Sequence, residues 1–391
     1  MIRAAVGLSI RPDASEAARE AASRACDRLG APRADWCVVF ATPDHAAAAS
    51  ELLEGVGASA GTPYVAGCSG AGVVAEGREV EDGPAVGVLA VSADEIRATP
   101  FLFRDGGDLG LSAGREAGER LVGSRGLDDL ILAWPDPRQV RPDRFLRGIE
   151  EILPGVPVAG GAAAGRAASG PPLLFHGTET AEAAVSGVRL GGRFRHRAAV
   201  TQGCRPLTGP LVVTRSHGNL VLELEGRPPL SLLAEASPEG LLDAGGGAFD
   251  RLFVGLLPDA TATGIAAGGY LVRSILTADE DTGVIGIAAE VEEGDSILFA
   301  VREGGAARKD LARVLADASA KAEGPWRFGL YFDCLARGRS LYGETGVDSA
   351  LLESAFPGLP ILGFFCAAEI APLGGVNRVL TYTGALILIG D

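Results

Sequence analysis

The sequence lacks the patterns that mark several common functional classes. No apolar run approaches the roughly eighteen residues that a membrane-spanning helix requires. The six cysteines include no CxxC pair, so neither a disulfide framework nor a zinc knuckle is predicted. The four histidines form no HxxxH or HExxH pattern, and we therefore predict no metal site. Scattered cysteines suit a reducing compartment, so we expect the protein to be cytoplasmic.

Excess positive charge is also missing. The net charge of the chain is -15 and its pI is about 4.8, which makes a surface that follows nucleic-acid phosphates improbable. With 391 residues, of which 47% are hydrophobic, the chain is long enough for two domains with complete cores. We therefore expect a globular protein that has no nucleic-acid partner and no transmembrane segment.

One order of elements, strand–helix–strand–strand, occurs three times along the chain. The three copies span residues 36–92, 129–190 and 330–389. In each copy the second strand ends on or contains a glycine, which is Gly67, Gly160 or Gly363. The spacing from Pro43 to Gly67 nearly equals that from Pro135 to Gly160, and the third copy is longer. Matched spacing of several features indicates an internal repeat.

Alternating strands and helices predict a layered core. The fold class that we predict is α/β, a layered αββα arrangement with mixed sheets and internal strand-helix-strand-strand repeats. Asp13 and Glu16 suggest a capping box at the start of a first helix, and further helices are expected at 112–122 and 306–322. Between the second and third copies the pattern becomes rich in strands. A change of composition near residues 191–197 places the domain boundary so that the domains are 1–194 and 195–391.

The C-terminal part carries two distinctive motifs. Cys334 ends an apolar strand three residues before Arg337-Gly338, and a second apolar run leads into Glu369-Ile-Ala-Pro. Together these motifs resemble the C-terminal FIST domain, a sensory module. The Val65–Gly72 corner resembles the N-terminal FIST domain, and Tyr270-Leu-Val-Arg273 is similar to another part of the C-terminal one.

The resemblance implies a sensory, signal-transduction protein that binds a small ligand such as an amino acid or another metabolite. It also implies a separate signalling protein as partner. Some relatives are thought to hold haem and to report nitric oxide, so a haem-based gas sensor is one alternative. Among the histidines, His176 after an apolar strand is the best candidate for an axial ligand, but a surface position suits it better. We therefore predict no cofactor.

The corner at Cys68-Ser69-Gly70-Ala71-Gly72 resembles a nucleophile elbow, which requires Gly-x-Ser-x-Gly. Ala71 stands where the last glycine would be, so the pattern fails and a tight turn is the better interpretation. Small residues let the backbone approach a ligand closely. We therefore count Cys68, Ser69, Gly70 and Gly72 as candidate ligand contacts.

Around Arg337 the sequence leaves two interpretations open. Arg337 can bind a carboxylate of the ligand bidentately, with Gly338 freeing the backbone, or it can form an ion pair with Glu369. Cys334 is either a reactive thiolate, activated by nearby arginines, or a small buried hydrophobic residue. A Cys-dependent acyl or thiol enzyme that uses Cys334 is the alternative to a sensor, and we expect a binding protein rather than an enzyme.

Glu369 lies in an apolar stretch, where a carboxylate is normally paired or poised for a polar ligand. Tyr270 and Arg273 stand three residues apart on a predicted strand, so at most one of them faces any given pocket. The predicted ligand site therefore contains Cys68, Ser69, Gly70, Gly72, Tyr270, Arg273, Cys334, Arg337, Gly338 and Glu369.

Overall fold

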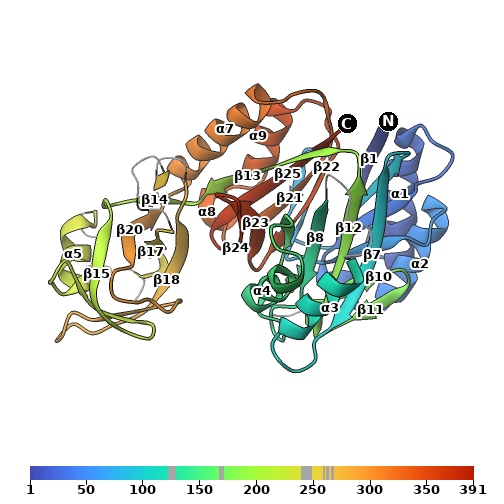
Figure 1. The fold of residues 1–391 in the computed structure, drawn as a ribbon. Helices are drawn as coiled ribbons and strands as arrows, with labels where there is room; N and C mark the ends of the chain where they lie inside the picture. Colours follow the sequence, from blue (N-terminus) through green and yellow to red (C-terminus); the bar gives the residue numbers. More distant parts are fainter. Residues whose placement is uncertain (122–128, 167–170, 239–248, 259, 261–263, 266–267) are drawn as a thin grey trace. The chain divides into compact units, whose positions relative to one another are not determined.

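The computed structural model describes residues 1–391 apart from 122–128, 167–170, 239–248, 259, 261–263 and 266–267 (Figure 1). The described chain forms two compact units. The first unit contains Met1–Val200, Leu311–Val379 and Gly384–Asp391, and the second contains Thr201–Asp310 and Leu380–Thr383. This spatial grouping is distinct from the predicted division into 1–194 and 195–391, because most of the C-terminal third packs with the N-terminal part.

Three six-stranded sheets are built chiefly from the first unit. The strands of the first sheet are, in spatial order, β1 (Ile2–Ser9), β6 (Val86–Ala93), β2 (Trp36–Ala41), β3 (Val65–Ser69), β10 (Leu174–His176) and β11 (Glu179–Ala181). Those of the second are β7 (Ile96–Arg104), β12 (Ala184–Gly192), β8 (Leu130–Pro135), β9 (Val158–Gly161), β23 (Glu369–Leu373) and β24 (Val376–Leu380). Those of the third are β13 (Arg195–Gln202), β25 (Thr383–Gly390), β21 (Trp326–Cys334), β22 (Ile361–Cys366), β4 (Val73–Ala75) and β5 (Arg78–Val80).

All three sheets follow the same plan. The central strands are a parallel pair, β2 with β3, β8 with β9, and β21 with β22. Each pair is connected through a helix, namely α2 (Ala49–Ala60), α4 (Pro142–Ile152) or α9 (Val347–Ala355). An antiparallel strand, β6, β12 or β25, lies on the other side of the first strand of each pair. The α/β class with mixed sheets is confirmed.

A short hairpin completes each sheet, and it comes from a different copy of the predicted repeat. The β4–β5 hairpin of the first copy pairs with β22 of the third. The β10–β11 hairpin of the second copy pairs with β3 of the first, and β23 of the third copy pairs with β9 of the second. The sequence had indicated corners at residues 65–72 and at Glu369 and an apolar strand before His176, but not the pairing of these segments.

Helices cover the outer face of each sheet (Figure 1). Buried residues of α1 (Ala14–Leu29) and α2 pack on the first sheet, those of α3 (Leu111–Leu121) and α4 on the second, and those of α7 (Gly304–Ala320) and α9 on the third. The inner faces meet in an aromatic core, where the ring centroid of Phe40 lies 5.5 Å from that of Trp134 and 4.4 Å from that of Phe364. Any two sheets with their helices therefore form helix, sheet, sheet and helix layers.

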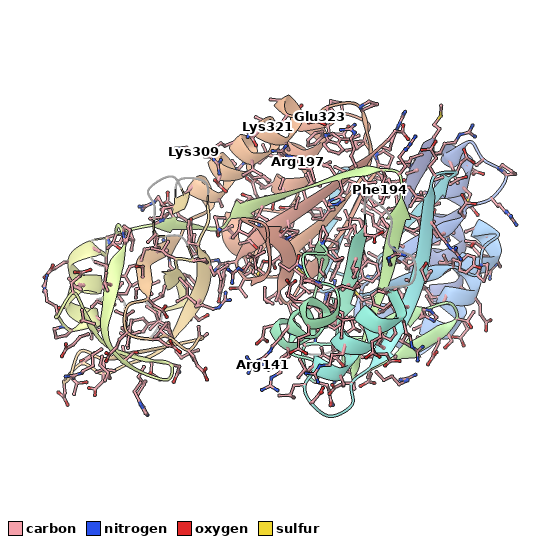
Figure 2. All side chains as sticks on the ribbon, in the orientation of Figure 1. Arg141, Phe194, Arg197, Lys309, Lys321 and Glu323 are labelled. Carbon is pink, nitrogen blue, oxygen red and sulfur yellow. The ribbon has the colours of Figure 1, made fainter. Side chains whose placement is uncertain are left out.

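The helix ends agree closely with the expected ones. The Asp13 side chain accepts a hydrogen bond of 2.8 Å from the Glu16 N–H and caps α1. The Glu16 carboxylate pairs with Arg11, so only the first half of the capping box forms. α3 follows its predicted span, whose last residue, 122, lies outside the described residues. Both lysines of the chain, Lys309 and Lys321, lie on α7 or directly after it (Figure 2).

The three glycines of the predicted repeat occupy the same place in the three sheets. Each lies opposite a residue of the neighbouring parallel strand, with pairs Val39–Gly67, Ala133–Gly160 and Tyr331–Gly363. A Cβ atom on the glycine would lie 1.8, 1.9 or 2.2 Å from the carbonyl oxygen of that partner. Only glycine fits at such a close approach between two backbones.

The second unit is a separate β structure. Its strands are β14 (Cys204–Pro206), β20 (Ser296–Arg302), β15 (Leu211–His217), β16 (Leu220–Leu224), β19 (Ile285–Ile287), β18 (Leu271–Ala278) and β17 (Leu252–Leu256), with helix α5 (Pro229–Ala236). Pairing of β17 with β20 closes the strands other than β14 into a ring. β15 and β16 pair as a hairpin, in the part of the chain where the sequence predicted many strands. In the part of the chain that the structure describes, no helix is long and apolar enough to cross a membrane.

Candidate functional site

Arg337 lies at the centre of a buried polar network at the end of β21. Its side chain is 1% exposed. The guanidinium Nε and Nη2 donate hydrogen bonds of 2.9 and 2.8 Å to Oδ2 of Asp348, and Nη2 donates a third, of 2.7 Å, to the Tyr342 hydroxyl. Its Nε also lies 2.9 Å from Oδ1 of Asp333. The sequence had suggested an ion pair with Glu369, and the structure instead pairs Arg337 with Asp348, with Asp333 close by.

Asp348 is the acceptor that holds this network together. Its fully buried carboxylate also accepts hydrogen bonds of 2.7 Å from the hydroxyls of Tyr331 and Tyr342. Asp348 stands in the first turn of α9, where the helix dipole stabilises a negative charge. The network therefore fastens the start of α9 to β21, which lies in the sheet beneath the helix.

Asp333 has a different role from that of Asp348. Neither of its carboxylate oxygens has a hydrogen bond in the described structure, because the single N–H on Nε of Arg337 points to Asp348. Burial, together with the nearby Asp348 charge, raises the pKa of Asp333 well above its usual value. The protonated form of Asp333 is therefore favoured, which limits the number of anions around the single Arg337 cation.

Glu369 lies on the first position of β23, opposite Gly161 of β9, and is fully buried. The Cys366 thiol is 3.3 Å from Glu369 Oε1 and 3.2 Å from the Asp333 carbonyl oxygen, to which it can donate. Burial, and then the Glu369 charge, raise the pKa of Cys366, so its sulfur stays protonated. In the other two hairpins, apolar Val73 and Leu174 take the place of this glutamate.

The Cys68–Gly72 turn is firmly built into the core. The Ser69 hydroxyl donates to the Ala164 carbonyl at 3.0 Å, and the N–H groups of residues 69, 70 and 71 all donate to carbonyls of the protein. A Cβ on Gly70 would lie 2.7 Å from the Phe364 ring, and one on Gly72 would lie 2.6 Å from a carbonyl oxygen. Burial raises the pKa of the Cys68 thiol. These residues fit a packing role, and a contact with ligand stays a prediction.

The structure brings this turn beside β22, because the Ala71 N–H donates to Phe365 and the Phe365 N–H donates to Gly72. Cys334 is 4% exposed at the end of β21, and its carbonyl accepts a 2.7 Å hydrogen bond from the Arg337 N–H. In one of the two interpretations of Cys334, nearby arginines would activate its thiol; Arg337 is instead paired with Asp348. Gly338 has a φ of +55°, so the backbone favours a glycine at this position.

Tyr270 and Arg273 belong to the second unit. The Tyr270 side chain is 4% exposed, and its hydroxyl donates a 2.7 Å hydrogen bond to the Cys204 carbonyl. The Arg273 guanidinium donates to the Val272 carbonyl at 2.7 Å. They are thus grouped with each other, while the other eight predicted residues belong to the first unit.

A cleft of about 680 Å³ opens beside α9 in the first unit. It is lined by Ala4, Ala5, Val6, Arg28, Val74, Glu76, Gly77, Ser349, Leu352, Glu353, Gly358, Leu359, Pro360 and Ile361. Arg28 pairs with Glu76 on one side, and the Glu353 carboxylate accepts a 3.1 Å hydrogen bond from the Gly358 N–H on the other. None of these residues was predicted from the sequence, since each charge on its own resembles an ordinary surface charge.

Two histidines bear on the haem alternative. His176, the best candidate for an axial ligand in the sequence, is partly exposed at the end of β10. His45 is 3% exposed, neither ring nitrogen has a partner in the described structure, and burial lowers its pKa. The cavity beside His45 is only about 10 Å³, room for one water molecule but not for a haem. Among the described residues, no group of three or more His, Cys, Asp and Glu side chains is placed to hold a metal ion.

Comparisons with known proteins give the family. The FIST N domain matches residues 35–227 and the FIST C domain matches residues 242–372, and the chain belongs to the FIST family. Domains of this family are generally associated with sensory signal transduction.

Full-length relatives exist in mycobacteria. The uncharacterized protein MT0656 of Mycobacterium tuberculosis (strain CDC 1551 / Oshkosh) is 34% identical over 395 residues, which cover 100% of both chains. The uncharacterized protein Mb0898c of Mycobacterium bovis is 34% identical over 391 residues, covering 100% of this chain and 99% of its own. Among solved structures, a cyanuric acid hydrolase from A. caulinodans covers 49% of this chain and 71% of its own, with 11% identity and a TM-score of 0.29. So distant a likeness carries no argument about activity.

Proposed function

We propose that the protein is a cytoplasmic sensory protein that binds a small metabolite, such as an amino acid, in the cleft beside α9 and signals to a separate protein. The observation that carries the proposal is the position of the cleft against the helix that the buried network holds. The volume of about 680 Å³ lies in the range of small-molecule sites. Membership of the FIST family supports the sensory role.

The charges of the cleft suit a zwitterion. The Arg28 guanidinium can face a ligand carboxylate, and the Glu353 carboxylate can face a ligand ammonium group. Apolar side chains, among them Val74, Leu352 and Ile361, would cover the remaining part of the ligand. The cleft thus contains an arginine and a glutamate, the residue types that the sequence suggested for ligand binding at Arg337 and Glu369, with Glu76 beside Arg28.

The buried network would transmit the occupancy of the cleft. Ser349 and Leu352 of α9 line the cleft, and Asp348, directly before Ser349, is bonded to Arg337, Tyr331 and Tyr342. A ligand that displaces α9 must therefore alter these hydrogen bonds. In this proposal Arg337 acts on the ligand through the helix instead of touching it.

Isothermal titration calorimetry with amino acids, selected after native mass spectrometry of protein from its host, tests the proposal. Glu353→Gln keeps an acceptor for the Gly358 N–H and removes only the charge, so the affinity should fall about tenfold or more. Glu51→Gln, on an exposed part of α2, is the matched control and should bind like the wild type. Wild-type affinity in Glu353→Gln would show that the ligand, if any, binds elsewhere.

A further inference from the structure

The cleft beside α9 continues into a second hollow that follows β1. The second hollow has a volume of about 550 Å³ and is lined by residues 1–4, 326–327 and 355–360. We call the two hollows together the β1 groove. Because residues 4–6 line the cleft and residues 1–4 line the second hollow, the β1 groove runs along the first half of β1. The residues that line both hollows are Ala4, Gly358, Leu359 and Pro360.

β1 is an edge strand, so the backbone on one of its sides has no neighbouring strand. Among the described strands it pairs with β6 alone. On the other side, the Ile2 N–H donates a 2.8 Å hydrogen bond to the Asp391 carboxylate. The Val6 carbonyl accepts one of 3.0 Å from Arg28. Because every second residue of an antiparallel strand turns its backbone groups to the same side, those of Ala4 also point away from β6.

Ala4 has an unused donor and an unused acceptor on this side. Its N–H and its carbonyl have no hydrogen-bond partner among the described residues, and Ala4 is partly exposed and lines both hollows. Unpaired N–H and C=O groups on an edge strand are a template for pairing with another chain, and proteins usually cover them. Side chains take the Ile2 N–H and the Val6 carbonyl, whereas Ala4 is left open to the main chain of an extended ligand.

The unpaired side-chain charges of the groove have opposite signs in its two hollows. In the cleft, Arg28 is paired with Glu76, and the Glu353 carboxylate has no basic partner among the described residues. In the second hollow, Arg3 donates to the Gly30 carbonyl at 2.6 Å and has no acidic partner in the described part of the chain. The other arginine of that hollow is paired with a carboxylate. A peptide with free ends carries an ammonium group and a carboxylate, so its charges match this order.

We propose that the β1 groove binds a free tripeptide in an extended conformation, about 10 Å long, as an additional antiparallel strand beside β1. A tripeptide is the shortest peptide whose middle residue has both an amide N–H and an amide carbonyl, and these exchange two hydrogen bonds with Ala4. The ammonium group faces Glu353 and the carboxylate faces Arg3, which sets the antiparallel direction. The inference rests on the proposed function, because it extends the ligand of the same cleft by two residues and moves its carboxylate from Arg28 to Arg3.

The test uses the full chain and a library of tripeptides with alanine at both ends and each of the common amino acids in the middle. Native mass spectrometry detects binding, and calorimetry gives the affinity. We expect at least one tripeptide to bind with a Kd of about 1 mM or tighter. A methyl group on its middle nitrogen removes the N–H that faces Ala4 and should weaken binding about tenfold or more. A methyl group on its third nitrogen, which points away from β1, is the matched control and should change the affinity less than about threefold.

Two variants locate the ligand carboxylate. Arg3→Gln keeps a donor for the Gly30 carbonyl, and it should weaken the tripeptide about tenfold but leave the affinity of the C-terminal amide of the same peptide unchanged. Arg33→Gln, at an exposed residue outside the groove, is the matched control and should bind as the wild type does.

Four results would overturn the inference. They are equal effects of the two methyl groups, wild-type affinity in Arg3→Gln, equal binding of the tripeptide with both ends blocked, and no binding of any tripeptide up to 20 mM, which is about twenty times the expected Kd. Single amino acids, measured in parallel, test the proposed function separately. If they bind in a manner that depends on Glu353 and no tripeptide binds, the inference alone fails.

Discussion

Replacing Arg337 by alanine should destabilise the first unit strongly. The change removes three hydrogen bonds from the guanidinium, two to Asp348 and one to Tyr342, and leaves a fully buried carboxylate without its cation. Removing one partner of a buried ion pair costs about 3–5 kcal/mol. The two tyrosine hydroxyls that remain on Asp348, at 2.7 Å each, favour the lower part of this range. For a unit of this size the midpoint should fall by roughly 6–20 °C.

Urea unfolding followed by circular dichroism, together with a thermal scan, measures the loss. Arg339→Ala is the matched control, two residues away. Its side chain is 58% exposed and pairs with the 75% exposed Asp82, so its loss should cost less than about 1 kcal/mol. The double variant Arg337→Ala/Asp348→Ala should cost less than the sum of the single changes by about 1–3 kcal/mol, since neither then leaves an unpaired charge.

A free energy of unfolding of Arg337→Ala within about 1 kcal/mol of the wild-type value, as is expected for Arg339→Ala, would show that the buried Arg337–Asp348 pair does not stabilise the unit. Additive single and double variants would show that Arg337 and Asp348 do not depend on each other. A stable Arg337→Ala protein that binds ligand at least thirtyfold more weakly would instead return Arg337 to direct contact with an anionic ligand, which was the expectation from the sequence.

Further predictions concern single positions. Since the pKa of Asp333 is raised, the native state keeps a proton that the unfolded chain releases above about pH 4, so this group lowers stability as the pH rises toward its native pKa. Asp333→Asn has no such proton, so its unfolding free energy relative to that of the wild type should increase between pH 5 and pH 8. Unfolding free energies of the two proteins that change in parallel with pH would contradict this prediction. Gly67→Ala should cost at least about 3 kcal/mol in urea unfolding, because its Cβ would lie 1.8 Å from the Val39 carbonyl oxygen. Gly209→Ala, which meets no atom within 4 Å, should change stability little, and a mild effect at both positions would show that the backbones can separate.

Much of the fold was predictable because its signals are local. The strands around Trp36 and Leu130 are continuous apolar runs, and the helices between them have regular spacing, so each element could be assigned from its own residues. The glycines at 67, 160 and 363 could be aligned because the same close contact with the neighbouring strand occurs in each sheet and requires a glycine each time. The recurring strand order is what such a repeat requires.

The hairpins escaped prediction for a physical reason. β4, β5, β10 and β11 are three residues long, too short to show an alternating pattern, and their partners are remote in sequence. In the site, Arg337 could be singled out from the sequence as a candidate, but its partner Asp348 resembled an ordinary residue of a first helical turn. Asp333 could have been predicted as a site residue, because a carboxylate within an apolar strand is normally paired or poised for a polar ligand, as for Glu369.

The pairing of the hairpins also determines when the protein can fold during its synthesis. The hairpin strand at residues 73–75 meets the sheet that it joins only at residues 361–366, after residues 201–310 of the second unit have been made. The first sheet lacks its last hairpin until residues 174–181 have been made, and the β4–β5 hairpin has no sheet to join until residues 361–366 have been made. Domains commonly complete their folding from the N-terminus as they emerge. In this chain the sheets of the first unit are complete only when nearly the last residue has been made. The N-terminal half therefore has unpaired strand edges during most of the synthesis of the chain. Such edges are the surfaces that chaperones shield and through which proteins aggregate.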